Sequence, residues 1–138
     1  MWTFLLFSAA AISTMAQRFR WEGIDVELYC KLFIDSMLDK RDIESAIIKH
    51  FAGRFDGFTI ICHWAEIDVQ KNEEWDPERT SWPAGFLYSK FYADVTPVDG
   101  VERSQYITEL AKLVRLLREQ ECLVVPSCDF EEDISALS

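Results

Sequence analysis

Between residues 58 and 69 every second residue is apolar, and the parity of this alternation changes in the middle. Up to Trp64 the apolar residues occupy even positions, and from Ala65 they occupy odd positions, with Glu66 and Asp68 between them. Successive side chains of a strand point to opposite faces, so the pattern predicts one long strand with a bulge, a twist or a change of neighbour near Trp64. Glu66 and Asp68 are expected to share a face of that strand.

Three further strands and two helices follow from the same test of periodicity. Residues 21–34 and 85–96 alternate, which predicts strands with one buried face, and 122–126 predicts a short final strand. Apolar residues recur at helical spacing after Asp39, the expected N-cap, as far as Gly53, the expected stop. A second helix is expected after Ser104 as its cap.

The resulting order, β-α-β-β-α-β, predicts an α+β protein with the ferredoxin-like plait. In that architecture two helices cover one face of a four-stranded antiparallel sheet, and the other face is open. We expect an apolar N-terminal segment over residues 1–20 and a single domain over residues 21–138. An acidic tail is expected at residues 129–133.

The apolar run from Trp2 to Ala16 leaves three interpretations open: a signal peptide, a mis-set translation start and a loosely attached helix. The run is too short for a stable membrane span. The four cysteines have neither metal-site spacing nor a C-x-x-C pair, and three fall in apolar strand patterns. Buried thiols in a cytoplasmic protein are therefore favoured, and export with a disulfide between neighbouring strands stays open if residues 1–16 are a signal peptide.

The formal net charge of -10 indicates which classes of partner the chain would attract. A field of this sign repels nucleic acid and anionic membranes and attracts basic partners. No glycine-rich phosphate loop, nucleophile elbow or zinc-protease motif occurs, so neither a cofactor nor a catalytic residue is expected, and whether the chain is an enzyme is left open with a leaning against it.

His63 with Glu66 and Asp68 is the nearest approach to an open divalent-metal site. In a regular strand His63 points away from the two acids, so a histidine beside solvated carboxylates is the favoured interpretation and no metal is expected. The irregular segment 71–84 contains Trp75 and Trp82 among charged residues. Such aromatics are either interface anchors or residues folded back to pin the loop.

Two segments, Gly85–Tyr88 continuing to Asp94–Pro97 and Cys128–Asp133, resemble small acidic bacterial proteins of uncharacterised activity. In size, charge and architecture the chain is also similar to immunity proteins, which neutralise secreted toxins. This resemblance implies a non-enzymatic protein of immunity or inhibitor type that occludes a basic protein partner. The oligomeric state is not predicted.

Two sets of candidate residues follow. The expected partner-binding residues are the acids and tryptophans Glu66, Asp68, Glu73, Glu74, Trp75, Asp76 and Trp82. The alternative is a small-molecule sensor or enzyme that uses the open sheet face, with Tyr29, His63, Tyr88 and Tyr92 as ligand-binding residues.

Overall fold

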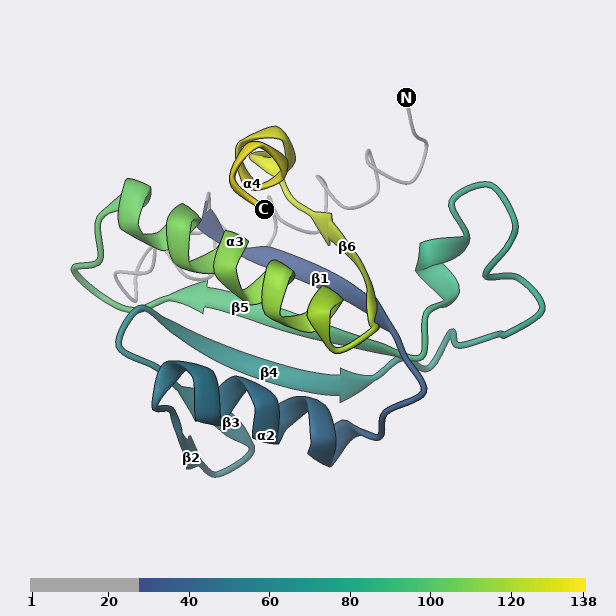
Figure 1. The fold of residues 1–138 in the computed structure, drawn as a ribbon, viewed down its shortest axis with the longest axis horizontal. Coiled ribbons are helices and arrows are strands. Elements are labelled where there is room, and N and C mark those ends of the chain that lie inside the picture. Colours follow the sequence, from purple (N-terminus) through teal and green to yellow (C-terminus); the bar gives the residue numbers. More distant parts are fainter. Residues whose placement is uncertain (1–27) are drawn as a thin grey trace.

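The computed structural model describes residues 28–138 (Figure 1). The expectations for residues 1–20 and for the beginning of the strand at Trp21 lie outside this range. The elements, in chain order, are β1 (Cys30–Asp35), α2 (Lys40–Phe51), β2 (Arg54–Asp56), β3 (Thr59–Ile61), β4 (Ala65–Lys71), the 3-10 helix η3 (Gly85–Tyr88), β5 (Phe91–Pro97), α3 (Arg103–Glu119), β6 (Leu123–Ser127) and α4 (Glu131–Leu137). None of the helices in residues 28–138 has the length and apolar character required to span a bilayer.

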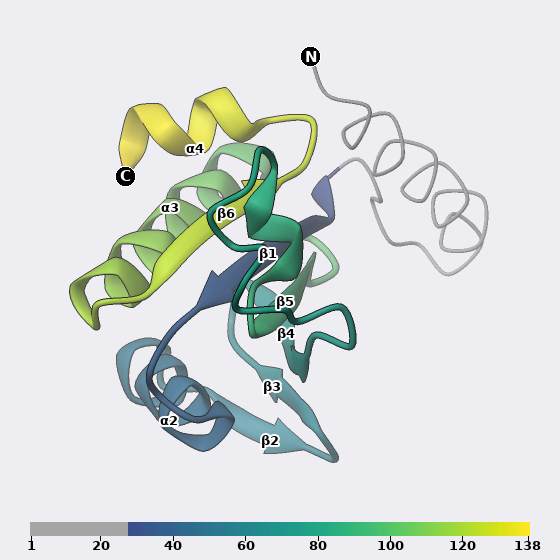
Figure 2. The same cartoon turned by 90° about the vertical axis from the view of Figure 1, so that its right-hand side faces the viewer.

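The described strands form one antiparallel sheet in the order β2-β3-β4-β5-β1-β6. Helices α2 and α3 lie on the same face of this sheet (Figure 2). The α+β class is therefore confirmed, but the four-stranded ferredoxin-like plait is wrong, because the sheet has six strands in the described part of the chain. The additional strands are β2 and β3, which extend the sheet beyond β4.

The change of parity near Trp64 is caused by a reversal of the chain. The predicted long strand is a hairpin of β3 and β4, and the Cys62 N–H donates to the Ala65 carbonyl across its turn (2.8 Å). Paired residues have numbers of opposite parity, as in Ile60 with Ile67, so the core residues change from even to odd positions. A strand that turns back on itself gives the same alternation as a strand that changes neighbour.

Helix α2 begins where its sequence predicts and ends within two residues of the predicted stop, Gly53. The Asp39 carboxylate accepts a hydrogen bond from the Asp42 N–H (2.9 Å), and the Asp42 carboxylate accepts one from the Asp39 N–H (3.4 Å). This reciprocal capping box satisfies donors that the first turn leaves unpaired. At the other end Ala52 adopts the left-handed conformation and the Gly53 N–H donates to the Ile48 carbonyl (3.0 Å).

The prediction for the start of α3 is wrong by two residues, because the cap position is Glu102 and not Ser104. Glu102 is the last extended residue, with ψ 147°, and Arg103 begins the helix without a side-chain cap, so Ser104 lies inside the first turn. Strand β5 is also shorter than its predicted segment. Residues 85–88 form η3, and the extended backbone begins at Phe91.

The predicted acidic tail is also wrong, because it leads into helix α4. Phe130 and Ile134 are buried, and the Phe130 ring meets the Tyr106 ring at a centroid separation of 6.2 Å. Two apolar residues at helical spacing are enough to dock this acidic helix on α3. Tyr106 in turn contacts Trp64, the largest fully buried side chain (5.6 Å). The four cysteines are free and buried.

Candidate interaction surface on the open sheet face

The sheet face opposite α2 and α3 carries a row of polar side chains from neighbouring strands. Lys31 on β1 is paired with Asp94 on β5, and Asp94 is paired with Asp68 on β4. The Thr59 hydroxyl on β3 donates to the Asp68 carboxylate (2.8 Å). Paired residues of adjacent strands point to the same face, so two carboxylates stand side by side at the centre of the sheet.

Three side chains act on the Asp94 carboxylate: Tyr29, Lys31 and Asp68. Burial raises the pKa of the Asp94 carboxyl, and the charge of Asp68 raises it further, whereas a hydrogen bond from the Tyr29 hydroxyl and the ammonium of Lys31 lower it. Burial, followed by the charge of Asp94, raises the pKa of the Tyr29 phenol. Tyr29 is therefore a protonated donor at neutral pH, and Asp94 is its acceptor.

Tyr92 connects the sheet face to the loop that follows β4. The Lys31 ammonium lies over the Tyr92 ring, 4.1 Å from its centroid. Burial raises the pKa of the Tyr92 phenol, and the charges of Asp94, Glu73 and Asp68 raise it further. Glu73 therefore acts on the same phenol as the two sheet carboxylates, which makes the loop acid part of one negative surface.

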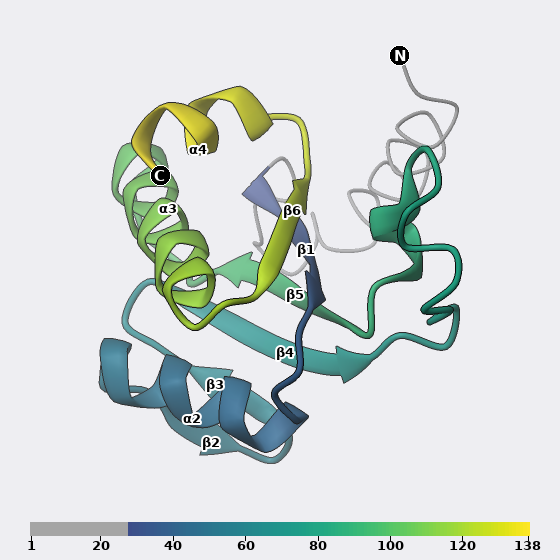
Figure 3. The ribbon, with the colours of Figure 1, turned by 45° about the vertical axis from the view of Figure 1, so that its right-hand side comes forward.

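The loop between β4 and β5 projects from the end of the sheet (Figure 3) and is held by one asparagine. The Asn72 side-chain amide donates to the carbonyls of Leu87 and Ser89 (2.8 Å each), and its oxygen accepts from the Glu74 N–H (3.1 Å). Gly85 is buried, and a Cβ at this position would overlap the carbonyl of Thr80. The loop is therefore a packed unit in which a buried glycine permits close backbone approach.

Both loop tryptophans are half-buried. Trp75 is 48% exposed and lies beneath the Lys90 ammonium (5.5 Å). Trp82 is 52% exposed, lies against the Arg79 guanidinium (4.9 Å) and meets the Tyr88 ring edge-on (6.4 Å). Each indole is positioned by its own loop, and about half of its surface is still exposed to solvent, so the two interpretations of these residues are compatible.

The other predicted partner-binding acids differ in their surroundings. Glu66 is exposed on β4, on the same face as Asp68, and Glu74 is exposed in the loop. Asp76 is used internally, because its carboxylate pairs with Arg79 (3.2 Å) and accepts from the Glu78 N–H (3.0 Å). We therefore regard Asp76 as a residue that shapes the loop.

The four alternative ligand-binding residues do not come together. Tyr29 and Tyr92 flank Asp94, but Tyr88 belongs to the loop cluster around Trp82, and His63 is exposed at the turn between β3 and β4. No group of three or more histidine, cysteine or acidic side chains suited to a metal ion exists within residues 28–138. His63, Glu66 and Asp68 thus do not form the open divalent site considered from the sequence.

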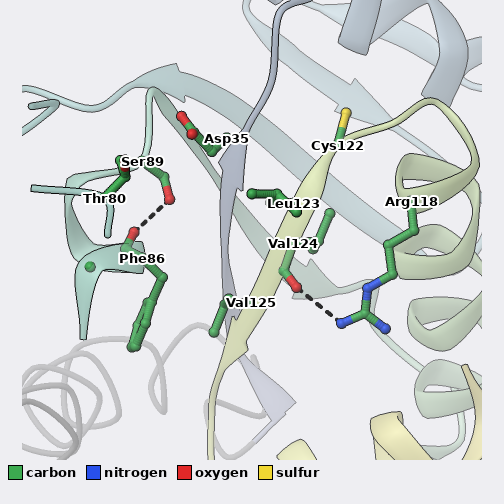
Figure 4. A pocket seen from close by; sticks show the side chains of 10 residues that line it. Asp35, Thr80, Phe86, Ser89, Arg118, Cys122, Leu123, Val124 and Val125 are labelled. Atoms are coloured by element: carbon green, nitrogen blue, oxygen red, sulfur yellow. Dashed lines mark hydrogen bonds between the residues drawn. The ribbon is translucent and has the colours of Figure 1, made fainter. Parts of the chain in front are cut away.

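A pocket of about 550 Å³ lies between the loop and β6 (Figure 4). Its wall includes Phe86, Leu123 and Val125, with Arg118 at one side, where the guanidinium donates to the Val124 carbonyl (3.0 Å). None of the four tyrosine and histidine candidates lines it. Sequence patterning did not indicate this pocket, because it forms between segments that are distant in the chain.

Comparison with known proteins adds no relative: no family model, curated protein or solved structure matches this chain. Asp94 is the site residue that sequence reasoning did not single out. Its alternation with Ala93 and Val95 places it on the face opposite the helices, but only the strand register identifies Asp68 as its neighbour.

Proposed function

We propose that this chain is a non-enzymatic interaction protein that binds a basic protein partner through the open sheet face and the adjoining loop. It would act by occlusion, as immunity and inhibitor proteins do. The observation that carries the proposal is the pairing of Asp68 with Asp94 across adjacent strands. Like charges in this position destabilise a sheet. A lysine or arginine of a partner placed between them would relieve the repulsion, and that gain exists only in the complex.

The loop supplies the second part of the proposed surface. Glu73 and Glu74 extend the negative field of the sheet face and would accelerate the encounter with a basic partner. Trp75, already held on one side by Lys90, has half of its surface left for a partner to cover. Burial of a preorganised tryptophan mainly slows dissociation.

The experiment is an NMR titration with an arginine-rich peptide and with an acidic peptide of equal length as the negative control. We expect amide shifts from the basic peptide to concentrate on β4, β5 and the loop. The double substitution Asp68→Asn with Asp94→Asn should weaken the binding by about tenfold. Asp99→Asn with Glu121→Gln removes two charges at exposed positions elsewhere and should change the binding little.

Loop variants separate the two contributions to the kinetics. Trp75→Ala should mainly raise the dissociation rate of the basic peptide, and Glu73→Lys with Glu74→Lys should mainly lower its association rate. Shifts spread evenly over the acidic surface, or equal losses in the control variants, would show that the peptide responds only to net charge and would contradict the proposed site.

The pocket beside β6 supports a second candidate, a small-molecule sensor, because its volume of about 550 Å³ lies in the range of ligand sites. A thermal-shift screen of metabolites tests it. Stabilisation that Val125→Trp abolishes would favour the sensor, whereas stabilisation that this variant leaves unchanged would count against the pocket.

A further inference from the structure

Strand β2 is an unprotected edge of the sheet. It pairs with β3 alone, as the last strand in the sheet order, and its three residues are exposed (Figures 1 and 2). A two-residue turn joins the strands, with Gly57 at φ +64° followed by Phe58, and Asp56 pairs with Thr59. Such a hairpin closes on a hydrogen-bonded pair, so the alternation of the ladder turns the Phe55 N–H and C=O outward.

The opposite edge strand, β6, lacks a free backbone donor at one position and a free backbone acceptor at another. Pro126 has no N–H to offer, and the Val124 carbonyl is occupied by the Arg118 guanidinium. A proline and a capped carbonyl are devices that block the addition of another strand. Strand β2 contains no proline, and neither the N–H nor the C=O of Phe55, which point outward, is bonded to another described residue.

Large aromatic side chains accompany this open edge. Phe55 is 50% exposed, and Phe58, at the turn, is 81% exposed. Phe55 pairs with the fully buried Ile60, so it lies on the sheet face that α2 covers, just beyond the end of the core. An apolar surface next to unpaired backbone groups is a template for an added strand.

The sequence of β2 is self-complementary in an antiparallel arrangement. When two copies of Arg54-Phe55-Asp56 are paired about Phe55, each Arg54 stands opposite the other copy's Asp56, and the two Phe55 rings stand opposite each other. Neither Arg54 nor Asp56 forms an ion pair with another residue of the 28–138 range. The outward Phe55 groups provide two main-chain hydrogen bonds at the centre of the pair.

We propose that two copies of this chain associate by antiparallel pairing of β2, which joins their sheets into one. The twofold axis of such a pair runs perpendicular to the sheet, so the open faces of both copies lie on the same side. The contact is small, and interfaces of this kind belong to the weak, reversible class. The proposal rests on β2 and is independent of the proposed function.

Sedimentation velocity from low micromolar to several hundred micromolar protein tests the pairing. We expect a concentration-dependent dimer in the unmodified chain. Arg54→Asp and Asp56→Arg each convert two opposite-charge pairs into two like-charge pairs, and should each weaken the dimer by about tenfold or more. Arg41→Asp makes the same charge change in the first turn of α2, away from β2, and should leave the dimer unchanged.

Charge exchange identifies the register. An equimolar mixture of the Arg54→Asp chain and the Asp56→Arg chain places opposite charges across every pair, so it should dimerise as the unmodified chain does. The double variant Arg54→Asp with Asp56→Arg should recover the homodimer for the same reason. Phe55→Pro removes the outward donor and leaves the pairing with β3 intact, so it should abolish the dimer.

The unfolding midpoint of each variant, measured by circular dichroism, checks that the domain remains folded. A chain that stays monomeric at several hundred micromolar overturns the proposal. So does a dimer that the single reversals leave unchanged, or a mixture of the two single variants that fails to associate.

Discussion

The carboxylate pair on the open face has a consequence for stability that can be measured without a partner. Asp68→Asn replaces one charge by a neutral side chain of the same shape, and its amide oxygen can still accept the hydrogen bond from the Thr59 hydroxyl. The substitution therefore removes the repulsion of Asp94 with little change in packing. We expect the variant to be more stable than the unmodified chain at pH 7.

The magnitude follows from the sheet geometry. Side chains of directly opposed residues lie about 5–6 Å apart, at which like charges repel by about 0.7 kcal/mol in water and about 3 kcal/mol at the effective dielectric constant of a protein surface. Asp68 is partly exposed and Lys31 lies near Asp94, so the lower part of that range applies. A gain of about 1 kcal/mol raises the unfolding midpoint of a domain of this size by about 3–5 °C.

The raised pKa of Asp94 determines how the stability gain of Asp68→Asn changes with pH. A folded-state pKa raised above its ordinary value means that the ionised Asp94 opposes folding, and that this penalty disappears as the pH falls through the folded-state pKa toward the unfolded value. The advantage of Asp68→Asn should therefore be greatest at neutral pH and shrink on acidification. The difference in unfolding midpoint between the variant and the unmodified chain at each pH removes the contributions of the other titrating groups.

Thermal unfolding monitored by circular dichroism between pH 4 and pH 8 is the assay, and NMR titration of the Asp94 carboxyl is the direct check. The pKa of Asp94 should fall toward its ordinary value in the variant. Asp99→Asn, at an exposed position between β5 and α3, is the matched control and should have little effect. An unchanged or lower unfolding midpoint for Asp68→Asn at pH 7 would refute the repulsion.

Three further predictions concern the rest of the fold. Thiol reagents should react slowly with the native chain, because burial raises the pKa of Cys62 to about 11 and also raises that of Cys30. Unfolding in guanidinium should make all four thiols reactive. Rapid labelling of Cys62 in the native chain would contradict its burial. Asp39→Ala should lower the urea midpoint because it breaks the capping box of α2, and Asp39→Asn should largely retain it. Gly85→Ala should shift the fluorescence of the loop tryptophans, because the added Cβ meets the Thr80 carbonyl; an unchanged spectrum would show that the loop is not packed as described.

Local patterns were the most reliable guide to this fold. The alternation that places Ile67 and Val69 in the core follows from burying one face of a sheet, and it holds whatever strands are neighbours. The start of α2 depends on two acids three residues apart, Asp39 and Asp42, whose capping interactions need no tertiary contact. The sequence therefore predicted the core-facing residues of β4 and one helix boundary correctly.

Features that depend on partners distant in the chain were missed. The turn between Cys62 and Ala65 contains no glycine, proline or asparagine, so its residues do not distinguish a reversal from a bulge. Helix α4 is an acidic segment that Phe130 and Ile134 dock on α3, and this contact has no local signature.

The candidate site was predicted in the same partial way. Residue spacing places Glu66 and Asp68 on one face, which the structure confirms. The pairing of Asp68 with Asp94 requires the register of β4 and β5, and that register is set across a long loop packed around Asn72 and Gly85. No periodicity within either strand contains this information.

Stability and binding measured on the same variant decide what the carboxylate pair is for. If Asp68→Asn raises the unfolding midpoint and weakens binding of the basic peptide, the repulsion between Asp68 and Asp94 lowers stability but strengthens the binding of a cationic partner. If the midpoint rises and binding is unchanged, the pair is incidental, and Trp75 and its loop must hold any partner alone. If the midpoint does not rise, Lys31 already neutralises the pair, and a cation from a partner would relieve no repulsion there.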